Sequence, residues 1–229
     1  MPIADFVHLK VRSAYSLTEG ANKVDAVVAL AKAQAMPAVA ITDRNNLFGA
    51  LEFAQYASKA GIQPIMGCDI GLRREEEGGI ATASKLPSVD WLTLLVQNEQ
   101  GYLNLMRLVS RAHLEFKTGS ISALPLSELE GHSDGLLAFT GSTSSGVGRL
   151  LLAGQAPAAA HMLERLQAVF DGRLYVELQR HGEDSERRIE APLLDLAYAR
   201  DLPLVATNDV HFPKASMYEA HDVLLCIEQ

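Results

Sequence analysis

The sequence of 229 residues is poor in cysteine and aromatic residues, and its acidic side chains outnumber its basic ones. Its two cysteines, Cys68 and Cys226, lie far apart in apolar surroundings, which is typical of reduced thiols and not of a disulfide framework. The net charge of −8 opposes binding to a polyanion. No stretch approaches the ~18 consecutive apolar residues of a membrane span, and no apolar signal segment opens the chain. We therefore expect a cytoplasmic protein that binds little nucleic acid by itself.

At 48% hydrophobic content, a chain of this length forms a sizeable core. Short apolar runs alternate with segments of helical periodicity, which predicts a parallel sheet covered by helices, either a barrel or an open doubly wound sheet. No linker divides the chain, and residues 73–89 are expected to form an exposed excursion. The predicted strands are Phe6–Val11, Ala38–Ile41, Pro64–Ile70, Trp91–Val96, Leu136–Phe139, Leu174–Leu178 and Leu204–Ala206.

Polar residues follow every predicted strand. In parallel α/β folds ligands bind at the carboxyl ends of the strands, so these side chains are expected to gather on one rim. The alternative is that the strands simply end where polar turns begin, and the repeated occurrence in register argues against it. The polar groups are Arg12–Ser13, Thr42–Asp43–Arg44, Asp69, Gln97–Asn98, Thr140–Gly141–Ser142, Gln179–Arg180–His181 and Thr207–Asn208–Asp209–Val210–His211.

The last polar group places a carboxylate two residues before an imidazole. Side chains alternate along an extended chain, so Asp209 and His211 are predicted to face the same side. That arrangement suits a metal, and a capping Asp followed by a surface His is the alternative. Structural or solvent-facing roles are expected for the helical and loop histidines His113, His132, His161 and His221.

Four long strings carry a family resemblance: FVHLKVRSAYSLTEGA, AVAITDRNNLFGALEFAQYASKAGIQPIMGCDIGL, LLVQNEQGYLNLMRLVS and LPLVATNDVHFPKASMYEAHDVLLCIEQ. From Phe6 to its last residue, the chain resembles the N-terminal PHP (polymerase and histidinol phosphatase) domain of bacterial replicative DNA polymerase III alpha subunits. The string ATNDVH favours the replicative over the translesion form. The resemblance implies a distorted seven-stranded (β/α) barrel of PHP type and a single PHP domain over residues 1–229.

Metal-binding members of this family hold up to three divalent metal ions on the barrel rim for phosphoester hydrolysis. Lys and Arg side chains are donor-only cations that repel such ions, so Lys10, Arg12 and Arg44 at ligand positions predict a vestigial site without metal and without catalytic residues. The residual candidate ligands are Asp69, Asp209 and His211. By the resemblance, the vestigial pocket consists of Lys10, Arg12, Glu19, Arg44, Asp69, Trp91, Ser142, Asp209 and His211.

The charges of this pocket balance, because Glu19, Asp69 and Asp209 oppose the three cations. An internal ion-pair network is therefore expected in place of the metal cluster.

The resemblance also implies what the full-length subunit does. It would be a DNA-directed DNA polymerase, a nucleotidyltransferase of bacterial DNA replication, whose Mg²⁺-binding palm domain lies downstream of Gln229. Residues 1–229 are expected to support that module and to dock the proofreading exonuclease subunit, without enzyme activity of their own. Two alternatives stay open: an active metal-dependent phosphoesterase of the PHP family, and a stand-alone small-molecule enzyme such as a histidinol phosphatase relative.

Overall fold

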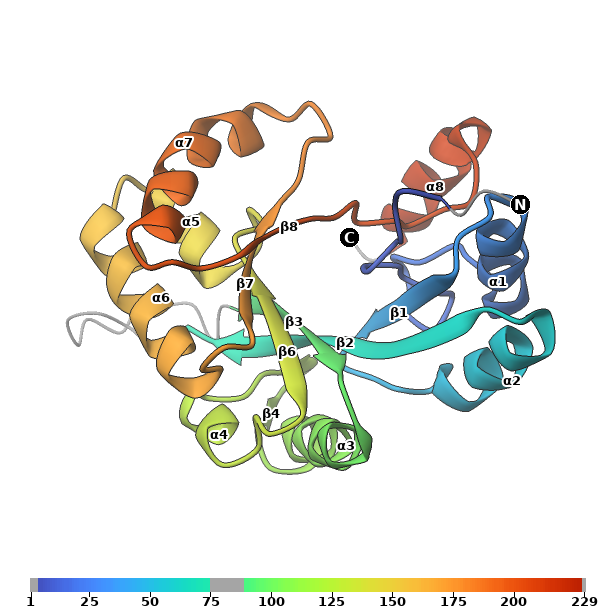
Figure 1. Cartoon of the computed structure of the whole chain (residues 1–229), viewed down its shortest axis with the longest axis horizontal. Helices are drawn as coiled ribbons and strands as arrows, with labels where there is room; N and C mark the ends of the chain where they lie inside the picture. The colour runs from blue at the N-terminus through green and yellow to red at the C-terminus, as the bar shows by residue number, and fades with distance from the viewer. Residues whose placement is uncertain (1–3, 75–88, 228–229) are drawn as a thin grey trace. The chain divides into compact units, whose positions relative to one another are not determined.

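The computed structural model describes residues 4–74 and 89–227, so the predicted excursion over residues 73–89 lies almost entirely outside the described residues. The chain folds as two units (Figure 1). The terminal unit comprises residues 1–68 and 207–229, and the central unit comprises residues 69–206.

The strands are β1 (Ala38–Arg44), β2 (Gln63–Arg73), β3 (Val89–Val96), β4 (Lys117–Thr118), β5 (Ile121–Ser122), β6 (Leu136–Thr140), β7 (Leu174–Leu178) and β8 (Leu204–Ala206). The helices are α1 (Val24–Ala33), α2 (Ala50–Ala60), α3 (Glu99–Leu114), α4 (Ser127–Glu130), α5 (Gly146–Leu152), α6 (Ala156–Val169), α7 (Asp184–Tyr198) and α8 (Tyr218–Leu225), with a 3₁₀ turn at Ala215–Met217.

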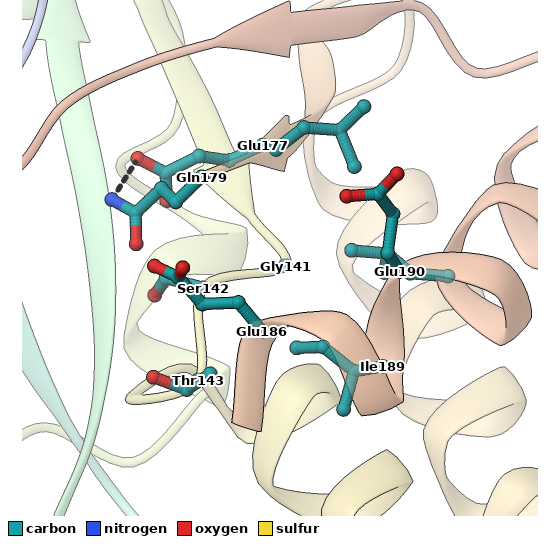
Figure 2. A pocket seen from close by; sticks show the side chains of 10 residues that line it. Gly141, Ser142, Thr143, Glu177, Gln179, Glu186, Ile189 and Glu190 are labelled. Atoms are coloured by element: carbon teal, nitrogen blue, oxygen red, sulfur yellow. Dashed lines mark hydrogen bonds between the residues drawn. The ribbon is translucent and has the colours of Figure 1, made fainter. Parts of the chain in front are cut away.

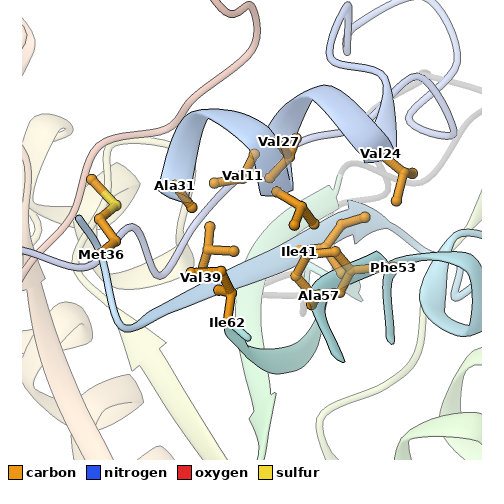
Figure 3. Packing of buried hydrophobic residues seen from close by; sticks show 11 residues of the cluster. Val11, Val24, Val27, Ala31, Met36, Val39, Ile41, Phe53, Ala57 and Ile62 are labelled. Carbon is orange, nitrogen blue, oxygen red and sulfur yellow. The ribbon is translucent and has the colours of Figure 1, made fainter. Parts of the chain in front are cut away.

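In the terminal unit, the hydrophobic core lies around β1, between α1 and α2 (Figure 3). Both helices turn an apolar face inward, since their buried residues recur at helical spacing. The inner residues of β1 are all buried. The core cluster consists of Val11, Val24, Val27, Val28, Ala31, Met36, Val39, Ile41, Phe53, Ala57 and Ile62.

The first predicted strand, Phe6–Val11, does not form a regular strand, so that prediction is wrong. The N–H of Ala40 in β1 donates to the carbonyl of His8 at 2.8 Å. On its other side, Val11 forms an isolated parallel bridge with Val210. The segment divides its few backbone hydrogen bonds between two neighbours, and neither pairing continues into a ladder.

The other six predicted strands all form, and they belong to a six-stranded sheet of order β1-β2-β3-β6-β7-β8. In the central unit β6, β7 and β8 are parallel, as expected. Strand β3 runs antiparallel to β6, with Thr93 opposite Phe139, so the prediction of a wholly parallel sheet is wrong. The apolar run of β3 reflects its burial and carries no information on its direction.

The direction of β3 places Gln97–Asn98 at the opposite end of the strand pair from Ser142, so these two residues do not join the predicted rim. Asn98 instead caps α3, where its side chain accepts a hydrogen bond from the Gly101 N–H at 3.0 Å. A Cβ on Gly101 would lie 1.9 Å from the carbonyl oxygen of Gly135, so only glycine allows this close approach.

Two further expectations from the sequence concern the cysteines and membrane-spanning helices. Both cysteines are free thiols, as expected, although Cys226 is exposed and only Cys68 is buried. Within the residues that the structure describes, no helix has the length and apolar character required to cross a membrane.

Candidate functional site

A bidentate ion pair between Arg12 and Asp209 lies at the centre of the site. The guanidinium Nε of Arg12 is 3.1 Å from Oδ1 of Asp209, and its Nη2 is 3.3 Å from Oδ2. Arg12 is fully buried, at 0% exposure. The bridge between Val11 and Val210 holds the two backbones side by side, so neighbours of the bridged residues meet. Both acceptor atoms of the Asp209 carboxylate are thus engaged by protein cations.

Glu19 extends this pair to a second arginine. Its Oε1 pairs with Nη1 of Arg44, the last residue of β1, and its Oε2 lies 3.9 Å from Nε of Arg12. Four side chains of alternating charge therefore follow one another in the order Arg44, Glu19, Arg12, Asp209. The segment before α1, the end of β1 and the segment after β8 each contribute to this network.

Two histidines meet at the backbone carbonyl of Glu19. Nε2 of His221 lies 2.6 Å from this oxygen, and Nδ1 of His211 lies 3.2 Å from it. A carbonyl oxygen only accepts, so both ring nitrogens carry a hydrogen. Nε2 of His211 lies 3.5 Å from Oδ2 of Asp209, so these two residues do face the same side, as their spacing predicts. His221 belongs to the site although its place in a helix gave no sequence signal.

The electrostatics of the cluster favour an ionised Asp209. Burial alone would raise the pKa of this carboxyl, and it is the largest single influence. The positive charge of Lys10, the hydrogen bond with His211 and the charge of Arg12 together outweigh it and hold the pKa well below its usual value. Lys10 is itself 1% exposed, so its charge acts across a medium that screens poorly.

Asp43, beside Arg44 in β1, organises the loop that carries Glu19. Its Oδ1 accepts from the Ser13 N–H at 2.7 Å and from the Ser16 hydroxyl at 2.6 Å, and its Oδ2 accepts from the Ser13 hydroxyl at 2.7 Å. The polar group after the second predicted strand includes Asp43, but its role in shaping this loop was not predicted. The only signal was its position directly after a buried strand.

Three predicted site residues, Asp69, Trp91 and Ser142, belong to the central unit. Asp69 is fully buried and accepts a hydrogen bond from the Thr93 hydroxyl at 2.9 Å. The backbone N–H of Trp91 donates to the Ser144 carbonyl at 3.0 Å, which holds the start of β3 at the loop after β6. The Ser142 hydroxyl lies 3.2 Å from that of Ser144.

Ser142 also lines a pocket at the carboxyl ends of β6 and β7, into which carboxylates of β7 and α7 project (Figure 2). Each of these carboxylates is hydrogen-bonded within the protein. Glu177 accepts from Gln179 at 3.2 Å, and Glu186 accepts from the backbone and the ring of His181 at 2.7 and 2.6 Å. Burial would raise the pKa of Glu186, and its hydrogen bonds with His181 lower it overall. The acidic side chains of this pocket therefore already have hydrogen-bond partners within the protein.

The donor set of the terminal unit does not fit a divalent metal cluster. Asp209 directs both oxygens to Arg12, and Nε2 of His211, the ring nitrogen that does not face the Glu19 carbonyl, lies 3.5 Å from the same carboxylate. Lys10 and Arg44 add positive charge that would repel a metal ion. Within residues 4–74 and 89–227, no group of three or more His, Cys, Asp or Glu side chains is arranged to hold one. The geometry is that of internal ion pairing.

The fold is a distorted (β/α) barrel of PHP type. A solved structure of a protein from Bifidobacterium adolescentis, named as a metal-dependent phosphoesterase, superposes with a TM-score of 0.55 over 93% of this chain and 90% of that chain. At 13% identity this likeness concerns the fold alone. The model of the PHP domain family matches residues 8–181, and the chain belongs to that family.

Curated relatives of this chain include DNA polymerase subunits. DNA polymerase III subunit alpha of Caulobacter vibrioides is 47% identical over 222 residues, which are 97% of this chain and 19% of the relative. The error-prone DNA polymerase of Symbiobacterium thermophilum is 37% identical over 237 residues, covering 97% of this chain and 21% of the relative. The chain therefore matches the PHP domain of DNA polymerase III alpha subunits and spans about a fifth of the length of these relatives.

Proposed function

We propose that this PHP domain is a metal-free scaffold of a replicative DNA polymerase III alpha subunit, in which an internal ion-pair network stands in place of the family's metal cluster. The bidentate contact of buried Arg12 with Asp209 carries the proposal. An arginine stays positively charged at any pH that a protein tolerates, so Arg12 neutralises a carboxylate that could otherwise coordinate a metal ion. The network of Arg12, Glu19 and Arg44 then replaces the stabilising role of the ions.

The energetics support a structural role. A buried ion pair repays its desolvation only with good geometry, and the loss of one partner leaves the other charge buried and uncompensated. The two-point contact of Arg12 with Asp209 provides that geometry. Catalysis by a metal-activated water would require these carboxylate oxygens to be available for coordination. In this arrangement both carboxylate oxygens of Asp209 accept hydrogen bonds from Arg12.

The roles of the whole subunit are part of the same proposal. Similarity to polymerase III alpha subunits over 97% of the chain supports DNA-directed DNA polymerase activity for the full-length protein, with Mg²⁺ held by a palm domain that follows the PHP domain. The PHP domain would support that module and dock the proofreading exonuclease subunit in the bacterial cytoplasm. With a net charge of −8, it would contribute little to DNA binding.

Metal analysis tests the scaffold proposal against the alternative of an active phosphoesterase. The 229-residue chain is incubated with Zn²⁺, Mn²⁺ and Fe²⁺, desalted, and assayed for bound metal and for phosphomonoesterase turnover. We expect substoichiometric metal and no turnover. A variant with Lys10→His, Arg12→His and Arg44→His tests whether removing all three cations restores binding that no single change restores. Stoichiometric metal with turnover in the unmodified chain would show that the domain is a hydrolase.

Exonuclease docking is tested separately by calorimetric titration of the chain with the cognate proofreading exonuclease subunit. We expect a saturable one-to-one complex that persists in the Arg180→Ala variant, a control that removes one exposed arginine. Absence of binding to the chain and to the full-length subunit alike would reject the docking role and leave the scaffold proposal intact.

A further inference from the structure

The last helix, α8, leaves a stripe of apolar side chains in solvent. Val223 is 66% exposed, and Ile227, in the turn that continues the helix, is 71% exposed. Ala220, which is also exposed, precedes them by three and seven residues, so the three side chains lie along one side of the helix. Apolar stripes of this kind normally face a core or a partner. We name these three residues the α8 stripe.

A different side of α8 attaches the helix to the terminal unit. His221 is the one buried residue of α8, and its Nε2 lies 2.6 Å from the Glu19 carbonyl oxygen. Its ring also lies 4.9 Å from the ring of Phe212, measured between centroids. Successive residues of a helix point about 100° apart, which turns Val223 and Ile227 away from the side that His221 attaches. The α8 stripe therefore faces outward from a helix whose orientation is fixed.

The helix is short of apolar burial. Isolated helices of fewer than about 12–15 residues are marginal in water, and most helices in proteins are stabilised by packing an apolar face. Helix α8 has 8 residues and attaches through the polar ring of His221. A surface that covers the α8 stripe would supply the burial that this helix otherwise lacks.

Two observations indicate what covers the stripe. The aligned part of this chain amounts to 19% of the Caulobacter vibrioides relative, and α8 is the last helix of the described chain. In a subunit of that length, most of the protein therefore lies outside these residues. Glu219, four residues before Val223, and Asp222 are both exposed beside the stripe. A covering surface with basic side chains would complement these two carboxylates.

We propose that the α8 stripe is the docking surface for the part of the polymerase subunit that follows residue 229. The docked surface would present apolar side chains to Val223 and Ile227 and lysine or arginine side chains to Glu219 and Asp222. This inference rests on the proposed function, in which the chain is the PHP domain of a longer polymerase subunit. Through His221, α8 would then join the loop of the ion-pair network to the rest of that subunit.

Cys226 reports on this surface, because it is exposed and lies between Val223 and Ile227 in sequence, whereas Cys68 is fully buried. The rate at which N-ethylmaleimide labels Cys226 is measured by peptide mass spectrometry in the 229-residue chain and in the full-length subunit. We expect labelling at least about tenfold slower in the full-length subunit, because a covered thiol reacts only after local opening. Equal rates would overturn the docking proposal and leave the metal-free scaffold, which metal analysis tests, intact.

A matched pair of variants tests the stripe itself. Val223→Gln combined with Ile227→Gln should leave the labelling rate and the thermal stability of the 229-residue chain unchanged, since both side chains are exposed. In the full-length subunit, the same change should raise the labelling rate of Cys226 to nearly that of the 229-residue chain. Leu114→Gln, which alters a leucine of α3 that is 84% exposed, is the control and should leave Cys226 protected.

Two outcomes would contradict the proposed occupant. If Cys226 stayed protected in the full-length variant with both glutamines, a surface other than the α8 stripe would cover it. If labelling of the 229-residue chain slowed as its concentration rose, the stripe would pair two copies of this chain and would not receive the rest of the subunit.

Discussion

The two units arrange their buried charges differently. In the terminal unit, Arg12, Glu19, Arg44 and Asp209 neutralise one another in a continuous series of ion pairs. In the central unit, Asp90 is 3% exposed and pairs with both Arg74 and Arg149, and no such series extends from it among the described residues. Each unit also contains a buried polar atom without a hydrogen-bond partner in the described part of the chain, Oε2 of Glu19 in the first and the hydroxyl of Thr140 in the second. The units therefore differ in the length of their ion-pair series, and the loss of one charge is expected to affect more neighbours in the terminal unit.

The largest expected effect comes from removing the centre of the ion-pair network. We expect Arg12→Ala to lower the free energy of unfolding by about 3 kcal/mol, because a fully buried side chain is lost and Asp209, whose side chain is 21% exposed, loses its two-point partner. Denaturant-induced unfolding measures this change. The matched control is Arg180→Ala, which removes an arginine from an exposed pair with Glu190 and should cost about 0–1 kcal/mol. A loss for Arg12→Ala as small as that of the control would show that the pair does not stabilise the fold.

The same pair should make stability depend on pH. The pKa of Asp209 in the folded protein is lower than in the unfolded chain, so folding favours the ionised form. Its contribution is present at neutral pH and is lost as the pH falls below the unfolded value of about 4 toward the folded pKa. Unfolding free energies at a series of pH values measure this decline. Asp209→Asn should weaken the dependence in the acid range, and an unchanged pH profile would contradict the assignment.

Arg44 tests whether the network extends beyond its central pair. Its side chain is 27% exposed, so solvent screens its contact with Glu19 and the expected loss for Arg44→Ala is smaller, about 1–2 kcal/mol. Because Glu19 also lies near Arg12, the double variant Arg44→Ala with Glu19→Gln should be less destabilised than the sum of the single variants. Denaturant unfolding of the four proteins gives the coupling. If the losses of the two single variants simply added up in the double variant, the contact between Arg44 and Glu19 would contribute nothing measurable to stability.

Much of this fold could be predicted from the sequence, because burial and periodicity are local properties. Six apolar runs became strands of the sheet. The direction of β3 could not be predicted, since an apolar strand buried on both faces has the same pattern in either direction. The extended segment before Arg12 failed to become a strand because its hydrogen bonds depend on two distant partners.

Part of the candidate site could also be predicted from the sequence, and part could not. The period-two spacing of Asp209 and His211 was sufficient to place them on one side. The contact of His221 with the Glu19 carbonyl depends on how α8 packs, and a single histidine in a helix gives no indication of that. The sequence also does not show that the hydroxyl of Thr140 has no hydrogen-bond partner among the described residues, because the tertiary structure decides which buried groups find partners.

The smallest expected change is that of Thr140→Val, and its comparison with Ser16→Ala sets a buried hydroxyl of one unit against a buried hydroxyl of the other. Ser16 is 3% exposed and donates to Oδ1 of Asp43 at 2.6 Å, so Ser16→Ala should cost about 1.5–3 kcal/mol through loss of a hydrogen bond to a charged acceptor. Thr140→Val removes a hydroxyl that has no hydrogen-bond partner within residues 4–74 and 89–227, so the free energy of unfolding should stay the same or rise by up to about 1 kcal/mol. Chemical denaturation measures both changes. If Thr140→Val instead destabilised the protein as much as Ser16→Ala, the hydroxyl of Thr140 would be a structural hydrogen-bonding group like that of Ser16.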